Sequence, residues 1–158
     1  MTVVGVGSPW GDDRVGWCVV DALAPRLVTA PVRVLKLDRP GPGLLDRIQA
    51  HRRILLVDAA ATGAPAGTLY SIPSDALPAA GAAASSHSLG VAEALALGCS
   101  LGLLPTELRL YLVSIDPRRT EPADSELSPT VAAAVGPLAA IMRRRLVAWG
   151  AARNATTR

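Results

Sequence analysis

The segment Ile54-Leu55-Leu56-Val57-Asp58-Ala59 begins with four aliphatic residues and continues into an acid. A short run that is apolar throughout is typical of a strand in the middle of a parallel sheet, because helices cover both faces of such a sheet. We expect a sheet of about five strands. The four other strand-like segments are residues 1–6, 32–37, 67–72 and 108–115.

Helical patterns alternate with these strands. The segment after Gly11-Asp12-Asp13 repeats apolar residues at helical spacing, and Ser128-Pro129 is typical of a helix start. Strands that alternate with helices predict an α/β domain, here a three-layer α/β/α sandwich around a mostly parallel sheet. The other helices are expected at residues 44–48, 89–101 and 129–146.

The composition suits one folded domain. Of the 158 residues, 50% are hydrophobic and 18% are charged, a balance that excludes an intrinsically disordered chain. No apolar run reaches the roughly 18 residues that a membrane-spanning helix needs, and the strand-like start at residues 1–6 is unlike a signal peptide. We expect a single domain over residues 1–150, a frayed tail over residues 151–158, and a cytoplasmic location.

The charge and the cysteine content bear on three classes of function: nucleic-acid binding, disulfide scaffolds and cysteine metal sites. The formal net charge is +3, but the arginines are scattered and only 3% of residues are aromatic, so a nucleic-acid surface with stacking side chains is not supported. Cys18 and Cys99 are too few for a disulfide scaffold and lack the spacing of metal ligands. We expect both thiols to be reduced and buried, and the protein to be a monomer that binds neither nucleic acid nor membrane.

Acidic residues follow the predicted strands. Asp13, Asp38 and Asp58 come after the first three strands, Asp116 comes after the last, and His87 begins the helix after the fourth. Ligands of α/β sheets bind beyond the carboxyl ends of the strands. Neighbouring strands lie about 5 Å apart, so Asp13, Asp58 and His87 can share one crevice if the first and third strands are neighbours. Two carboxylates and an imidazole suit a divalent transition metal, without separating nickel, zinc, manganese and iron.

Each of these residues has a structural alternative. Asp13 can be a neighbour of a helix cap, and His87 can itself be a local cap. Asp58 is harder to explain in this way, since it lies between Ile-Leu-Leu-Val and Ala-Ala-Ala, where a carboxylate is costly to bury without a partner. A functional role is favoured for Asp58 and stays open for the other two.

Other site patterns fit the chain poorly. Gly5-Val6-Gly7 followed by Gly11 lacks the spacing of the dinucleotide-binding G-x-G-x-x-G, and the acids Asp12 and Asp13 would repel a pyrophosphate. The chain has no G-x-S-x-G elbow, and Cys18 falls in the middle of a predicted helix, so a Ser or Cys nucleophile is not indicated.

Four segments in order resemble the hydrogenase maturation proteases, the endopeptidases that trim the large subunit of [NiFe] hydrogenases. The first is similar to the glycine-rich opening of the family, which contains two acids, and the second to its central strand, which ends in an acid. The third is similar to the His-x-x-Gly start of a helix. The fourth is similar to the end of the family's last strand and the cap of its final helix. The segments are Gly5–Gly16, Leu55–Ala59, Ser86–Gly90, and the group Ser114–Pro117, Glu121-Pro122 and Leu127–Pro129.

The resemblance implies roles for three residues. By position, the metal contacts of the family fall on Asp13, Asp58 and His87. We expect Asp13 and Asp58 to be catalytic, with a carboxylate as general base toward water or the metal polarising the scissile carbonyl. Nickel is then carried by the substrate, and other divalent ions can substitute for it. The chain departs from the family pattern in four ways. Ser8 stands where Asn is usual, and the loop from Gly7 to Asp12 is one residue shorter than is common. Asp13 stands where some members have Glu, and Arg14 adds a positive charge beside the acids.

The function implied is that of a cytoplasmic endopeptidase. Its partner is a [NiFe] hydrogenase large-subunit precursor, from which it removes the C-terminal extension after nickel insertion. The alternative is a non-catalytic, nickel-dependent binding or checkpoint protein on the same fold, which would use the same three residues.

Overall fold

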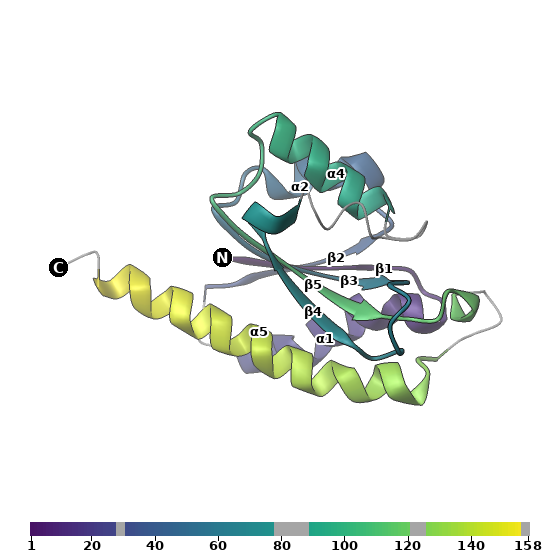
Figure 1. Cartoon of the computed structure of the whole chain (residues 1–158). Helices are drawn as coiled ribbons and strands as arrows, with labels where there is room; N and C mark the ends of the chain where they lie inside the picture. The colour runs from purple at the N-terminus through teal and green to yellow at the C-terminus, as the bar shows by residue number, and fades with distance from the viewer. Residues whose placement is uncertain (28–30, 78–88, 121–125, 156–158) are drawn as a thin grey trace.

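The sheet has five strands and is mostly parallel, as predicted. The structure, a computed structural model, describes residues 1–27, 31–77, 89–120 and 126–155 of the chain (Figure 1). The strand order is β2-β1-β3-β5-β4, and only β4 runs antiparallel to its neighbour. The strands are β1 (Thr2–Gly7), β2 (Arg33–Asp38), β3 (Arg53–Ala60), β4 (Leu69–Pro73) and β5 (Glu107–Ser114).

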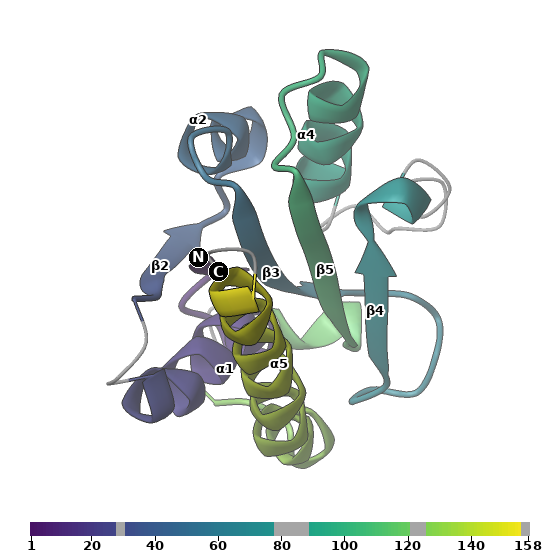
Figure 2. The ribbon, with the colours of Figure 1, turned by 90° about the vertical axis from the view of Figure 1, so that its left-hand side faces the viewer.

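Helices cover both faces of the sheet. One face packs against α1 (Val15–Leu23) and α5 (Pro129–Ala155), and the other against α2 (Leu44–Ile48) and α4 (Leu89–Ser100) (Figures 1 and 2). The three-layer sandwich is therefore confirmed. Among the described residues, no helix is long and apolar enough to span a membrane. The described residues also form short 3-10 helices: η1 (Gly11–Arg14), η2 (Ala24–Leu27), η3 (Gly41–Gly43), η4 (Ser74–Ala76) and η6 (Pro117–Arg119).

The segment around Leu55 forms the central strand, β3. Leu55 and Val57 face the cluster under α1 and α5, whereas Ile54 and Leu56 face the cluster under α2 and α4. All four are fully buried, which explains why this run shows no polar alternation. The position of β3 between β1 and β5 brings the exits of three parallel strands to one edge of the sheet.

The structure corrects three details of the sequence prediction. β3 continues to Ala60, so that Asp58 lies inside the strand, because the parallel ladder with β5 continues through Ala60. α5 continues to Ala155, past the expected helix end at residue 146 and into the expected tail of residues 151–158. Cys99 is exposed, not buried, since it lies on the outer face of α4, and Cys18 is half-buried. The sequence also predicts a surface loop up to residue 84, of which residues 78–84 lie outside the described residues.

A buried carboxylate fastens the loop after β1 to the start of α5. The two oxygens of Asp12 accept hydrogen bonds from the backbone N–H of Ser128 at 2.6 Å and from its hydroxyl at 2.8 Å. Asp12 is fully buried, and Pro129 takes the first position of the helix, as the sequence predicted. These two hydrogen bonds hold η1, and with it Asp13, against the end of the sheet.

The two hydrogen bonds between Asp12 and Ser128 predict a difference in stability between two variants. Asp12→Ala should lower the free energy of unfolding by about 2 to 3 kcal/mol, because both buried donors of Ser128 lose their acceptor. Ser128→Ala removes only one of the two hydrogen bonds and should cost about 1 kcal/mol. Urea unfolding followed by circular dichroism measures both. Equal effects of the two substitutions would contradict this account.

Candidate active site

Asp13 and Asp58 come from different elements and line one pocket. Asp13 lies in η1, directly after β1, and Asp58 lies near the end of the neighbouring strand β3. The pocket has a volume of about 270 Å³, and only 7% and 3% of the two residues' surfaces are exposed. The crevice predicted between the first and third strands is therefore present. The other lining residues are Val6, Gly7, Arg39, Pro40, Gly41, Gly90 and Val91.

Asp58 is held in an environment that disfavours its charge. It shares the α4 face of β3 with Leu56 and Ala60, which belong to the apolar cluster on that side. Burial, and then the negative charge of Asp13, raise the pKa of Asp58 to about 8, against a lowering effect of its hydrogen bond from the Ala59 N–H at 2.9 Å. At neutral pH this carboxyl group keeps its proton until a cation offsets the cost of ionisation.

Close backbone packing places Asp13. A Cβ atom on Gly7 would overlap the carbonyl oxygen of Asp13, and one on Gly16 would overlap the carbonyl oxygen of Val6. Glycine at these two positions lets η1 and α1 press directly against the end of β1. The glycine-rich opening of the chain thus serves to bring an acid to the sheet edge, beside β3.

The loop after β2 forms the rim of the pocket. Arg39 has a positive φ of 38° and donates its backbone N–H to the Gly7 carbonyl at 3.1 Å, while its guanidinium Nε donates to the Asp38 carboxylate at 2.8 Å. Asp38 is thus paired with a cation and is not among the pocket-lining residues. Sequence reasoning did not single out Arg39, although the Pro-Gly turn that follows it was a signal.

The fourth acid at a strand exit is also paired. Asp116 follows β5, and its carboxylate accepts hydrogen bonds from the Arg118 side chain at 3.0 and 2.7 Å. This pairing lowers the pKa of Asp116 to about 2. Of the four acids that the sequence placed at strand exits, the structure brings two together and neutralises the other two with arginines.

His87 lies outside the described residues. The helix that it was expected to begin, α4, starts at Leu89, and Gly90 and Val91 in its first turn line the pocket of Asp13 and Asp58. Within the part of the chain that the structure describes, no three His, Cys, Asp or Glu side chains gather as a metal site. The three-residue ligand set therefore stays a prediction.

Two buried carboxyl groups in one pocket can serve two kinds of chemistry. A protonated and an ionised carboxyl group can act as an acid and a base in the same reaction. Their oxygens can also bind a divalent cation, which would displace the proton of Asp58. Both uses fit a hydrolase.

Comparisons with known proteins agree on one family. The family model "Hydrogenase maturation protease" matches residues 18–144. The chain is 30% identical over 154 residues to the hydrogenase expression/formation protein HupD of Rhodobacter capsulatus, covering 95% of this chain and 72% of HupD. It is 31% identical over 140 residues to HoxM of Cupriavidus necator, covering 85% and 68% of the two chains.

Solved structures give the same result. The hydrogenase maturating endopeptidase HybD from E. coli superimposes with a TM-score of 0.77 at 27% identity, covering 94% of this chain and 93% of HybD. The solution structure of an endopeptidase from Escherichia coli gives a TM-score of 0.75 at 26% identity, covering 89% and 88% of the two chains.

Proposed function

Because the chain belongs to the hydrogenase maturation protease family, and is thereby a peptide-bond hydrolase, we propose that it removes the C-terminal extension of a [NiFe] hydrogenase large-subunit precursor after nickel insertion. We place this reaction in the cytoplasm. The observation that carries the proposal is the pair Asp13 and Asp58, buried in one pocket at the exits of two adjacent parallel strands.

Nickel enters this proposal as part of the substrate. Asp13 and Asp58 offer oxygen ligands, and His87 would add a nitrogen ligand; three ligands from one protein leave coordination positions for groups of another. The precursor would supply those remaining ligands together with the metal. Recognition of the metal would then test whether the precursor is ready for cleavage.

The residues of the pocket suit the hydrolysis of a peptide bond. A water oxygen attacks the scissile carbonyl carbon, the C–N bond breaks, and the leaving amine takes up a proton. A carboxylate of this pair is the base that accepts the proton of the water; for Asp58 this requires that a bound cation has displaced its own proton. Nickel on the precursor would polarise the scissile carbonyl when it is bound there.

The competing function is a non-catalytic checkpoint that binds nickel-loaded precursor without cutting it. Incubation of the protein with nickel-loaded precursor separates the two, with mass spectrometry of the precursor's C-terminus as the readout. A shortened precursor supports the protease. A stable complex with a precursor of full length supports the checkpoint and overturns our proposal.

Cation binding tests the proposed site without the precursor. Asp13→Asn, Asp58→Asn and His87→Ala should each weaken the binding of Cd²⁺ or Ni²⁺ at least about tenfold, because each removes one ligand from a set of three. Isothermal titration calorimetry measures the affinities. Asp21→Asn is the matched control, since Asp21 forms an exposed ion pair with Lys36 at 2.9 Å away from the pocket.

One calorimetric result would contradict the proposed metal-binding site. If Asp58→Asn and His87→Ala bind the cation as tightly as the wild type does, the proposed ligand set is wrong.

A further inference from the structure

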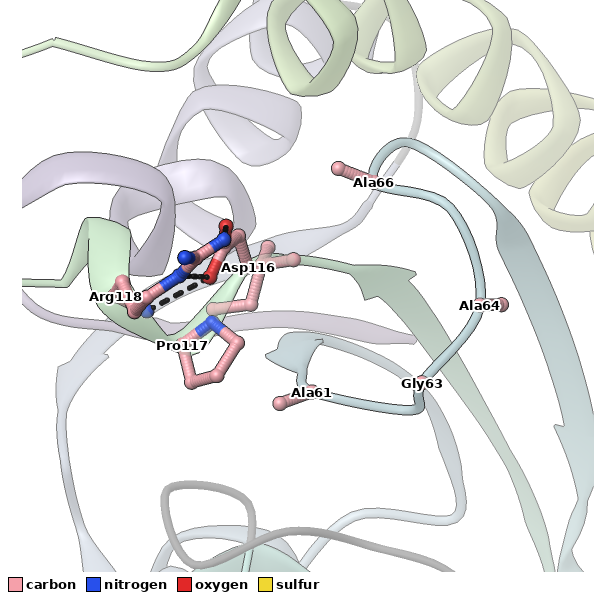
Figure 3. A pocket seen from close by; sticks show the side chains of 8 residues that line it. Ala61, Gly63, Ala64, Ala66, Asp116, Pro117 and Arg118 are labelled. Atoms are coloured by element: carbon pink, nitrogen blue, oxygen red, sulfur yellow. Dashed lines mark hydrogen bonds and ion pairs between the residues drawn. The ribbon is translucent and has the colours of Figure 1, made fainter.

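A second pocket lies at the same edge of the sheet, between the loop after β3 and the turn after β5 (Figure 3). Its volume is about 520 Å³, which is more than one side chain fills. None of the residues discussed for catalysis lines it. The lining residues are Ala61, Gly63, Ala64, Ala66, Ile115, Asp116, Pro117 and Arg118.

One wall of this pocket is held by a hydrogen-bond network. The hydroxyl groups of Thr62 and Ser114 lie 2.8 Å apart, and the Ser114 hydroxyl donates to the Ala64 carbonyl at 3.0 Å. The backbone of Ser114 exchanges two further hydrogen bonds of 2.8 Å, accepting from the Gly67 N–H and donating to the Thr68 carbonyl. Ser114 is fully buried. The loop after β3 is thus fastened to β5 before any ligand arrives.

The opposite wall carries a pair of opposite charges. The Asp116 carboxylate accepts hydrogen bonds from the Arg118 backbone N–H and from its guanidinium group, so each charge faces its partner (Figure 3). The other lining residues are alanine, glycine, isoleucine and proline. Most of the lining is therefore apolar, and an apolar group loses little on entering such a pocket.

The position of the pocket relates it to the catalytic carboxylates. Ala61 follows Asp58 by three residues along β3 and its exit, a separation of at most about 10 Å. An extended peptide covers this distance with about three residues. An endopeptidase must hold the polypeptide beside the bond that it cuts, and a preformed pocket lowers the entropy cost of doing so.

We propose that this pocket binds an apolar, extended segment of the precursor, about three residues from the scissile bond. The inference rests on the proposed function, because it takes the precursor as the occupant. It assigns to Ala61 and the walls beside it a role in substrate binding, separate from the chemistry at Asp13 and Asp58.

One alanine inside the pocket and one outside it provide a matched pair of variants. The Ala61 methyl group points across the pocket towards Pro117 (Figure 3). Ala133 is exposed on α5 and does not line the pocket. Ala61→Leu should raise the KM for nickel-loaded precursor at least about tenfold and leave kcat within about twofold, since it narrows the pocket without touching the carboxylates. Ala133→Leu should leave both constants within about twofold. The smaller step Ala61→Val should raise KM less than Ala61→Leu does.

Controls separate binding from folding. The melting temperatures of the variants should equal that of the wild type, and a precursor with glycine at the bound apolar position should be cut equally by the wild type and by Ala61→Leu. Cleavage with the same KM by the wild type and both Ala61 variants would overturn this inference alone. Absence of cleavage by the wild type would overturn the proposed function, and this inference with it.

Discussion

Asp58→Asn is expected to reduce cleavage of nickel-loaded precursor at least about a hundredfold. Asparagine keeps the shape of the side chain and can still accept the hydrogen bond from the Ala59 N–H, but it cannot ionise to act as a base or as an anionic metal ligand. The initial rate of C-terminal shortening, followed by mass spectrometry, measures the loss. Asp21→Asn serves as the control, because it makes the same chemical change in an exposed ion pair.

The same variant should fold at least as well as the wild type. The pKa of Asp58 is about 8 in the folded protein and about 3.9 in an unfolded chain. Between these values the folded state binds the proton more tightly, so the contribution of Asp58 to stability is lost as the pH rises from about 4 to about 8.

Asp58→Asn removes the ionisable carboxyl group, so the stability of this variant does not fall with rising pH in this way. The free energy of unfolding of this variant should exceed that of the wild type, and the difference should grow across that pH range to the order of a few kcal/mol. Urea unfolding at pH 5 and pH 8 gives the comparison. A variant that is stable and still processes the precursor at the normal rate would show that Asp58 is structural, and the mechanism proposed for this pocket would be wrong.

Nickel-free precursor is expected to remain uncut under conditions in which nickel-loaded precursor is cut completely. The sequence has no H-E-x-x-H motif that would hold a catalytic metal on one helix. Asp13, Asp58 and His87 are spread over three parts of the chain, and such an open set suits a metal whose other ligands come from the precursor.

The decisive comparison is between the two precursors at equal concentration. Free nickel added to the protease should not rescue cleavage of the nickel-free precursor, and unrelated peptides should not be hydrolysed. Mass spectrometry of the C-terminus reads all of these reactions. Equal cleavage of both precursors would refute recognition of the metal on the substrate, while leaving the pocket and the fold as they are.

Local sequence patterns were sufficient for most of the secondary structure. The apolar run at Ile54–Val57 was recognisable as a central strand, because burial on both faces leaves no room for polar alternation. Ser128-Pro129 marked the start of α5 correctly, since capping and the fixed φ of proline act within one turn. The family was identified correctly as well, because its segments occur in order along nearly the whole chain.

The end of β3 could not be predicted in the same way. No local sequence pattern near Asp58 indicates that the strand continues past it to Ala60. The continuation depends on the ladder with β5, whose residues pair with β3 from more than fifty positions away. An acid expected beyond a strand is therefore found inside it, and its burial raises its pKa.

The sequence by itself determined the alternation of strands and helices, the family, and the set of acids near the strand exits. Only the tertiary structure decided how those acids are used: Asp13 and Asp58 share a pocket, Asp38 and Asp116 are paired with arginines, and Asp12 holds the start of α5. The physical reason is that helix and strand periodicity act over a few residues. The charge partners and burial of a carboxylate depend instead on strand order and loop packing, which join residues far apart in the chain.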